Sequence, residues 1–155
     1  MLRALFVEFP NDPGSWLVDN EYLFGSDLLV APLLEEVTER DVYLPPGQWI
    51  DYQTKQVYDG GWHKIKAGDI PIVVLVKNGA VIPHIKLAQS TQDMDWSKLT
   101  LKVYATDATT TATGKVYLPG SDTVQTISTN KKGSSFEVGT NPLSSKTTFK
   151  TEWIK

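Results

Sequence analysis

The sequence predicts a mainly β fold, in which two buried strands at the N-terminal end precede one or two antiparallel β-sandwich domains. The sandwich is indicated from residue 42 onward, where short β-rich segments follow one another closely and turn-forming residues separate them. The first part of the chain differs, because residues 2–10 and 22–32 are continuous apolar runs rather than alternating ones. Strands that are apolar on both faces are typical of a parallel sheet covered by helices.

Composition sets limits on the kind of protein. The 155 residues suffice for one domain or two small ones, and 41% hydrophobic with 21% charged residues is ordinary for a globular chain. A net charge of −3 argues against a nucleic-acid partner, and the absence of cysteine excludes disulfides and thiolate metal sites. No apolar run approaches the roughly 18 residues of a membrane span. We expect a soluble chain of undetermined compartment, with any signal peptide outside it.

The connection between the two apolar runs is long enough for the helical crossover that parallel strands need. Asn11-Asp12-Pro13-Gly14 predicts a turn at its start, and Ser15 would cap a short helix over residues 16–18. The charged segment 35–41 follows the second run and marks a predicted domain boundary. Residues 1–34 are therefore predicted to be separate from the domain that follows.

Residues 35–89 are predicted to form a proximal sandwich. Asn78-Gly79 predicts a tight hairpin turn within it, because this pair supplies two positive φ values. Its expected strands cover residues 42–44, 49–52, 56–58, 62–65, 72–76, 81–82 and 84–89.

Residues 90–98 are predicted to be a linker, and residues 99–155 a distal β-rich domain or its start. In the first distal strand, 99–105, Leu99, Leu101 and Val103 share one face. Residues 106–113 are expected to be an irregular loop, and further strands are expected at 115–118, 123–128, 135–138 and 147–153.

Several motifs in fixed order resemble glycoside hydrolase family 31, whose members include retaining α-glucosidases and α-xylosidases. They are R-A-L-F-x-E-F-P at 3–10, Y-L-F-G-x-D-L-L-V-A-P at 22–32, V-Y-L-P-x-G-x-W-x-D at 42–51, D-G-G-W at 59–62, I-P-I-V at 70–73 and K-N-G-A-V-I-P at 77–83. The resemblance implies that residues 1–34 are a remnant of the last two strands of a (β/α)8 barrel. The form of residues 93–104 favours α-xylosidase-like members, whereas residues 114–120 depart from the commonest α-glucosidase pattern.

The resemblance also implies that both catalytic aspartates lie upstream of this sequence. The W-x-D-M segment of the family does not occur, since Trp49-Ile50-Asp51 is followed by Tyr52. We therefore expect a noncatalytic C-terminal region that braces the barrel and is inactive alone. The parent enzyme would hydrolyse terminal α-linked glucose or xylose in an oligosaccharide substrate, without a cofactor.

Three pairs within the chain are weaker candidates for chemistry. Asp93 and Asp95 would share a face of an extended segment with their Cα atoms about 6.6 Å apart, whereas retaining glycosidases need two carboxyl groups about 5–5.5 Å apart. Nothing nearby would raise the pKa of either residue. Glu8 and Asp27 flank the apolar runs, where capping or pairing with Arg3 explains them better. His63 and His84 lack metal-ligand spacing.

Four aromatic residues, Trp49, Tyr52, Tyr58 and Trp62, support an alternative function. They lie close together on a predicted hairpin, and exposed aromatic faces can stack on sugar rings. A stand-alone carbohydrate-binding or protein-interaction module is the alternative, although packing between barrel and sandwich explains these residues better. Without its barrel neighbours the segment 1–34 would be disordered, repacked on the sandwich, or buried in self-association with a second copy.

Overall fold

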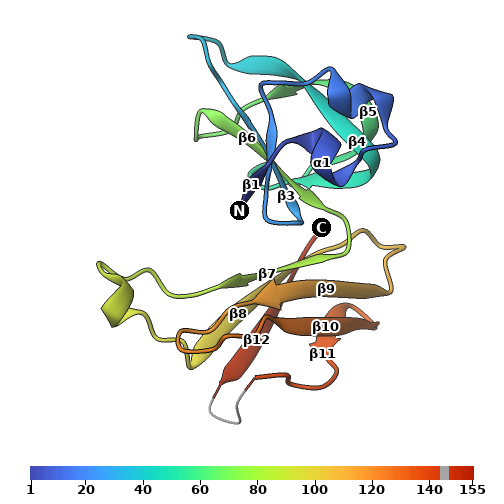
Figure 1. Cartoon of the computed structure of the whole chain (residues 1–155). Helices are drawn as coiled ribbons and strands as arrows, with labels where there is room; N and C mark the ends of the chain where they lie inside the picture. Colours follow the sequence, from blue (N-terminus) through green and yellow to red (C-terminus); the bar gives the residue numbers. More distant parts are fainter. Residues whose placement is uncertain (144–146) are drawn as a thin grey trace. The chain divides into compact units, whose positions relative to one another are not determined.

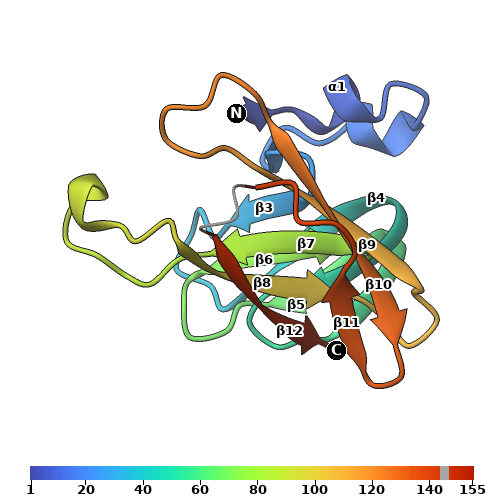
Figure 2. The ribbon, with the colours of Figure 1, turned by 90° about the horizontal axis from the view of Figure 1, so that it is seen from below.

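A computed structural model describes residues 1–143 and 147–155 and divides the chain into two compact units, Met1–Asn78 and Gly79–Lys155 (Figure 1 and Figure 2). Within the described residues each unit holds one six-stranded β-sheet, which confirms the mainly β class. The division after Asn78 replaces the predicted domain boundaries after residues 34 and 89. The reason is strand pairing, because the second apolar run joins the sheet of the first unit.

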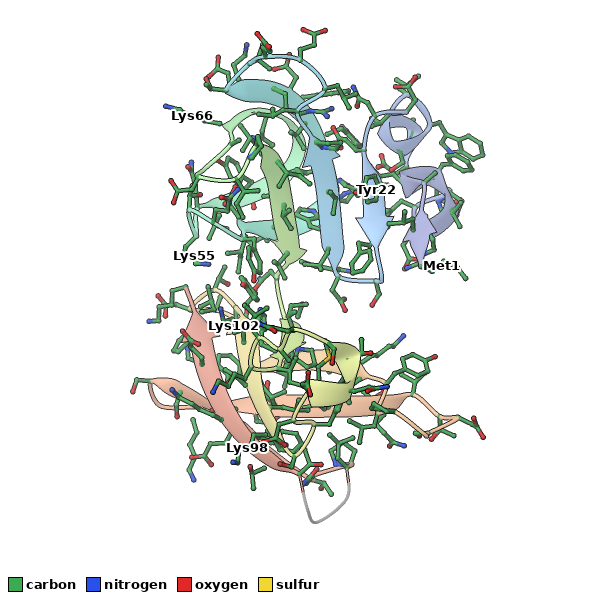
Figure 3. The ribbon with its side chains drawn as sticks, turned by 90° about the vertical axis from the view of Figure 1, so that its left-hand side faces the viewer. Met1, Tyr22, Lys55, Lys66, Lys98 and Lys102 are labelled. Carbon is green, nitrogen blue, oxygen red and sulfur yellow. The ribbon has the colours of Figure 1, made fainter. Side chains whose placement is uncertain are left out.

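The sheet of the first unit has the order β1-β2-β3-β6-β4-β5, and all its pairings are antiparallel. The short helix α1 (Leu5–Glu8) and the 3-10 helix η1 (Pro13–Trp16) connect its first two strands (Figure 3). The strands are β1 (Leu2–Arg3), β2 (Tyr22–Phe24), β3 (Leu28–Pro32), β4 (Glu39–Asp51), β5 (Val57–Lys66) and β6 (Ile72–Lys77).

The predicted pair of parallel barrel strands does not form. Residues 5–8 of the first run are helical, and the second run splits into the antiparallel hairpin β2–β3. Strand β3 then pairs with β6 on its other side, so its backbone has partners on both edges. The segment is thus repacked on the sheet, one of the three outcomes expected for it. The cap of η1 is Asp12 rather than Ser15, since the Asp12 side chain accepts a hydrogen bond from the N–H of Gly14.

Four predicted strands merge into the two long strands β4 and β5. The register between them shifts between Leu44 and Gln48, where Pro45-Pro46-Gly47 forms a bulge instead of ending a strand. Gly60 lies opposite, and a Cβ there would approach the Cα of Pro46 to 3.0 Å. Gly61 has a φ of +119°, which side-chain-bearing residues rarely adopt. The glycines between the predicted strands 56–58 and 62–65 therefore allow a bulge in a continuous ribbon.

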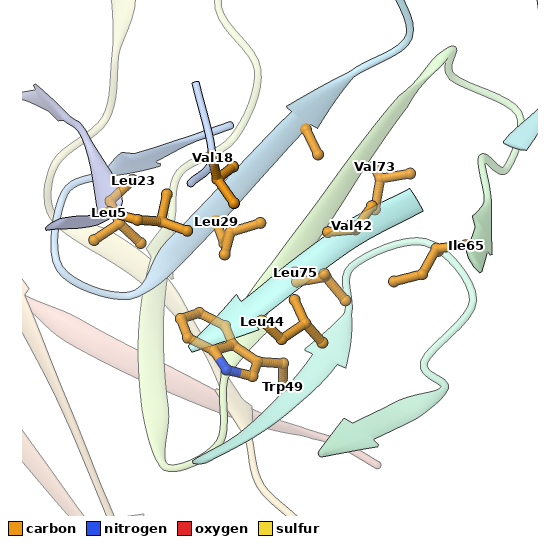
Figure 4. Packing of buried hydrophobic residues seen from close by; sticks show 11 residues of the cluster. Leu5, Val18, Leu23, Leu29, Val42, Leu44, Trp49, Ile65, Val73 and Leu75 are labelled. Atoms are coloured by element: carbon orange, nitrogen blue, oxygen red, sulfur yellow. The ribbon is translucent and has the colours of Figure 1, made fainter. Parts of the chain in front are cut away.

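The core of the first unit draws on every strand except the short β1, together with α1 (Figure 4). Trp49 is its largest side chain and is 1% exposed. The other buried members are Leu5, Val18, Leu23, Leu29, Ala31, Val42, Leu44, Ile65, Val73 and Leu75. Because Leu5, Leu23 and Leu29 belong to this cluster, residues 1–34 are part of the same core as the later strands.

The sheet of the second unit has the order β11-β10-β9-β7-β8-β12. It is mixed rather than purely antiparallel, because β12 runs parallel to β8 and β9 pairs in parallel with β7. The strands are β7 (Ala80–His84), β8 (Lys98–Tyr104), β9 (Thr111–Val116), β10 (Gln125–Lys132), β11 (Ser135–Val138) and β12 (Thr148–Ile154).

Alternating side chains form the core of the second unit. Leu99, Leu101 and Val103 of β8 are buried on one face, which confirms the predicted alternation. The two outer strands, β11 and β12, approach each other, so that Phe136 meets Trp153 edge to face at a centroid distance of 5.2 Å. The sheet therefore curls around its core.

Three local predictions differ from the structure. Asn78-Gly79 is not a hairpin turn: the N–H of Asn78 donates to Gln48 in the first unit, and that of Gly79 to Tyr104 in the second. Gly79 alone of the pair has a positive φ.

Residues 85–89 form no strand, and β9 begins within the predicted loop 106–113. Within the predicted linker, η2 (Thr91–Asp93) is a 3-10 turn. The predicted strand 147–153 overlaps β12, which begins after the undescribed residues 144–146.

Candidate functional site

The four candidate aromatic residues do not form one surface. Trp49 and Tyr58 are register partners on β4 and β5, whereas Trp62 pairs with Tyr43 further along the same ribbon. Trp49 is a core residue, and its indole N–H donates to the backbone oxygen of Pro45 at 2.9 Å. Tyr52 lies beyond the end of β4. A sugar ring therefore has no access to Trp49 in this unit.

The remaining three aromatics differ in exposure. Tyr58 is half-buried against the core and meets His63 edge to face at 5.3 Å; burial, followed by the charge of Asp51, raises its pKa. Trp62 is 58% exposed, with its ring 5.3 Å from that of Tyr43. The ammonium of Lys55 lies 5.2 Å from the ring of Tyr52. Trp62 is thus the most exposed of the four.

Tyr43, which the sequence did not single out, anchors the N-terminal segment to β4. Its hydroxyl donates to the Asp12 carboxylate at 2.8 and 2.9 Å, and the Ser15 hydroxyl donates to the same group at 2.7 Å. Burial and then the contact with Asp12 raise the pKa of Tyr43 to about 12. At Asp12, burial alone would raise the pKa, but the hydrogen bonds from Ser15, Tyr43 and Gly14 outweigh it and lower the pKa. The Asn-Asp-Pro-Gly turn predicted the local bend but not its partner 31 residues away.

Glu21 is the second residue that sequence analysis missed. It is buried, and one carboxylate oxygen accepts the N–H of Tyr43 at 3.0 Å while facing Arg40 at 3.5 Å. The other oxygen, Oε2, has no hydrogen-bond partner among the described residues. Burial raises the pKa of Glu21 to about 7, against the opposing effects of Tyr43 and Arg40. No pattern in the sequence marks this position, because its burial depends on strands that are distant along the chain.

Arg40 ties together the segments around Glu21. Its guanidinium donates to the backbone oxygens of Asn20 at 3.1 Å and Pro32 at 2.7 Å, and to the Asn20 side chain at 2.7 Å. It therefore acts mainly as a structural clamp between the start of β4 and the residues that precede β2 and end β3.

The candidate acid pairs are engaged in local contacts. Asp93 accepts from the Ser90 hydroxyl at 2.7 Å, and Asp95 lies 3.8 Å from the Lys98 ammonium. Hydrogen bonds from Ser97 lower the pKa of Asp95, whereas a glycosidase acid requires a raised one. This turn therefore supplies no acid with the required pKa.

The other candidates have structural partners. Glu8 pairs with Arg3, as the sequence predicted, at 2.5 Å, and Asp27 accepts from the Ser26 hydroxyl at 2.8 Å. His63 and His84 lie in different units. The described residues contain no group of three or more His, Cys, Asp or Glu that could hold a metal ion. None of the described helices is long and apolar enough to cross a membrane.

The N-terminal segment of the first unit carries an apolar surface. Phe6 and Trp16 stack at a centroid distance of 4.8 Å, and the indole N–H of Trp16 donates to Pro10 at 3.0 Å. Shallow hollows of about 490 Å³ lie beside this surface, one lined by residues 2–4 and 19–22 with Pro32 and Leu34, the other by residues 8–13 and Pro46. We call the exposed residues of this segment the N-terminal apolar surface: Leu2, Phe6, Val7, Trp16, Leu17, Phe24 and Leu34.

Comparisons with known proteins relate the first unit to one family. Residues 1–82 match the family model described as the glycosyl hydrolase family 31 C-terminal domain. Alpha-glucosidase 2 of Bacillus thermoamyloliquefaciens is 35% identical over 97 residues, which cover 61% of this chain and 12% of that protein. The alpha-xylosidase of Saccharolobus solfataricus is 30% identical over 109 residues, covering 67% of this chain and 15% of that protein.

Solved structures extend the similarity to both units. A GH31 dextranase of Flavobacterium johnsoniae, complexed with glucose, matches with a TM-score of 0.75 and 26% identity, covering 88% of this chain and 18% of that one. The GH31 alpha-xylosidase of Xanthomonas citri shares the fold, with a TM-score of 0.77 and 24% identity, covering 99% of this chain and 18% of that one. The chain spans less than a fifth of each of these four proteins.

Proposed function

This chain belongs to glycosyl hydrolase family 31, and from that premise we propose that it braces the catalytic barrel of a parent α-glycosidase without supplying catalytic residues. The parent would act on terminal α-linked glucose or xylose, in keeping with relatives named alpha-glucosidase and alpha-xylosidase. Its double displacement needs two carboxyl groups about 5–5.5 Å apart, one of them protonated. The candidate acids of this chain offer no such pair, which favours catalytic residues outside it.

The N-terminal apolar surface carries this proposal. Of fifteen large apolar side chains that are exposed among the described residues, eight lie within residues 1–34, including Met1. Leu17 is 79% exposed. Some of these side chains adjoin one another, since Phe6 stacks on Trp16 and Leu2 is the register partner of Phe24. Adjoining exposed apolar groups are typical of an interaction site, because they are costly in water. The barrel of the parent would cover it, since these residues directly follow the proposed position of the barrel in the chain.

The packing of two candidate aromatic residues into the core also argues against a sugar-binding surface. With Trp49 in the core and Tyr58 half-buried, Trp62 and Tyr52 remain on separate parts of the unit. No observation favours a stand-alone carbohydrate-binding module over the bracing function.

Two activity measurements test this proposal, one on the isolated chain and one on the chain combined with its barrel. The purified chain should release no chromophore from aryl α-glucosides or α-xylosides. A separately expressed barrel, encoded by the sequence preceding Met1 in the parent, should gain activity when this chain is added. We expect Leu17→Glu to weaken that complementation at least about tenfold, because it places a charge in a buried apolar contact.

The matched control is Leu87→Glu, which adds the same charge at a 96% exposed leucine of the second unit. It should leave complementation unchanged. Equal losses for the two variants would contradict the proposed contact. Turnover by the isolated chain that disappears in Glu21→Gln would contradict the noncatalytic role.

A further inference from the structure

The second unit presents basic and hydroxyl side chains on one face of its sheet. In the observed register His84 of β7 lies beside Thr100 of β8, and Thr100 lies beside Lys150 of β12. Register partners point to the same face of a sheet, and residues two apart along a strand share that face. Lys98 therefore accompanies Thr100, and its register partner Thr148 accompanies Lys150.

This face is hollowed. A shallow depression of about 410 Å³ is lined by these five residues and by Lys86, together with Ile85, Leu99 and Phe149. Lys86, Lys98 and Lys150 are exposed, and the Lys98 side chain is 79% exposed. We call the residues His84, Lys86, Lys98, Thr100, Thr148 and Lys150 the basic hollow. Lys102 continues the same face along β8 (Figure 3).

Charge is unevenly divided between the two units. Residues 1–78 contain six lysines and arginines against twelve acidic residues, a net charge of −6. Residues 79–155 contain nine lysines against six acidic residues, a net charge of +3. Two acidic residues oppose the basic hollow: Asp95, 3.8 Å from Lys98, and Glu152, the register partner of Lys102. With Lys102 counted, four lysines on this face stand against these two carboxylates.

We infer that the basic hollow binds an acidic polysaccharide, a linear glycan whose carboxylate groups meet the lysines and whose hydroxyl groups meet the threonines. Ammonium groups attract carboxylates without demanding a fixed geometry, which suits a flexible polymer. The Thr100 hydroxyl can donate and accept, as the hydroxyl groups of a sugar do, while the Thr148 hydroxyl donates to the backbone oxygen of Ser97 at 3.2 Å and offers its oxygen as an acceptor. A shallow, open depression accommodates a chain that runs through it.

A glycan fits this face better than a nucleic acid does. Arginine is the preferred residue for bidentate recognition of phosphate and bases, and both arginines of the chain, Arg3 and Arg40, belong to the first unit. Specific DNA contacts by a single module also bury about 600–1,000 Å² with many phosphate contacts. The basic hollow offers three lysines.

The competing explanation is protection of an edge strand. Strand β12 is the last strand in its sheet order, and exposed lysines on edge strands discourage pairing with other chains. That role requires no saturable ligand binding. The inference rests on the second unit alone, so it stands or falls independently of the bracing function.

The test measures binding of polygalacturonate to the full chain at low ionic strength, with uncharged dextran as the neutral control. We expect saturable binding of polygalacturonate only, weakened by added salt because exposed charges are screened. The variant K86Q/K98Q/K150Q should bind at least about tenfold more weakly, since three exposed charge contacts are lost. The variant K86R/K98R/K150R keeps the positive charges and should retain binding. That result would show that the glutamine variant loses binding through lost charge and not through misfolding.

The matched control removes the same charge elsewhere. Lys64, Lys66 and Lys132 are exposed and lie outside the basic hollow, and K64Q/K66Q/K132Q should bind less than about twofold more weakly than the parent chain. Equal losses in both glutamine variants would overturn the site, because net charge alone would then explain binding. Absence of saturable binding would overturn it as well. The glycan assignment would be overturned if a short DNA duplex bound as tightly as polygalacturonate and if K86Q/K98Q/K150Q abolished that DNA binding.

Discussion

Glu21 illustrates how a single buried carboxyl group makes stability depend on pH. Burial raises its folded-state pKa to about 7 from an ordinary value of 4.5. Between these two values the folded chain keeps the proton while the unfolded chain releases it. The free energy of unfolding should therefore fall as pH rises through this window, by on the order of 3 kcal/mol, and level off above the folded-state pKa.

Replacing Glu21 with glutamine should abolish this fall, because the side chain keeps an acceptor for the Tyr43 N–H but no longer titrates. Hydrogen-exchange protection of the core amides in β3 and β6, measured from about pH 5 to about pH 8 and corrected for intrinsic exchange, reports on the first unit. The exposed Glu36→Gln serves as control and should keep the parent profile. A Glu21→Gln profile that still falls would assign the pH dependence to another group.

Individual residues were the hardest features to predict. Pairing of Glu8 with Arg3 was one of two structural roles expected, beside capping, and it is present. Trp49 belonged to a correctly located strand, yet only the packing of the other strands decides that it is buried. Glu21 and Tyr43 acquire their environments from contacts about twenty or more residues away, which local patterns do not encode.

At the scale of elements, alternation and turn residues located most strands, but they did not predict how the strands are connected and paired. Strand β11 coincides with its predicted range, β6 differs from its range by one residue at its end, and β8 is shifted by one residue at both ends. Pro45-Pro46-Gly47 and Gly60-Gly61 lie between predicted strands and instead form a bulge in the β4–β5 ribbon. The continuous apolar runs were assigned to a parallel sheet because they are apolar on both faces. In the structure only part of them is buried, through α1 and the antiparallel β2–β3 hairpin in the core of the first unit, whereas Leu2, Phe6, Val7 and Phe24 are exposed.

Strand β9 approaches β7 so closely that the side chain at residue 114 is restricted. A Cβ at Gly114 would lie 2.0 Å from the backbone oxygen of Val81, so Gly114→Ala must separate the two strands. We expect a loss of about 2–3 kcal/mol in the stability of the second unit, as for other overpacked sites. Urea unfolding combined with hydrogen exchange of β8 amides measures it.

Gly139→Ala provides the matched control for this substitution. Its Cβ would meet the nearest atom, in the Asn130 side chain, at 3.6 Å, an ordinary contact. A change within about 0.5 kcal/mol is expected there. Similar losses for both variants would mean that general glycine effects, and not the β7–β9 approach, limit stability.

At the scale of the whole molecule, each unit has its own sheet, core and charge. The sequence motifs predicted the family and its C-terminal location, which the match over residues 1–82 confirms. The division after Asn78 was not predictable from composition, because the charged segment 35–41 looks like a boundary although strands on both sides of it enter one sheet. Within that unit the uncovered apolar residues are concentrated in the segment nearest the proposed barrel.

That concentration leads to a prediction about the chain in isolation. Without a barrel to cover the N-terminal apolar surface, copies should associate through it as protein concentration rises, because burial of this apolar area is favourable in water. Sedimentation velocity should show a concentration-dependent increase in mass, reduced by Leu17→Glu and unaffected by Leu87→Glu. Adding the separately expressed barrel should compete with self-association, since both contacts would use the same residues. A mass that stays monomeric at all concentrations would show that this surface is too small or too divided to hold a second copy, while self-association insensitive to Leu17→Glu would place the contact on another part of the chain.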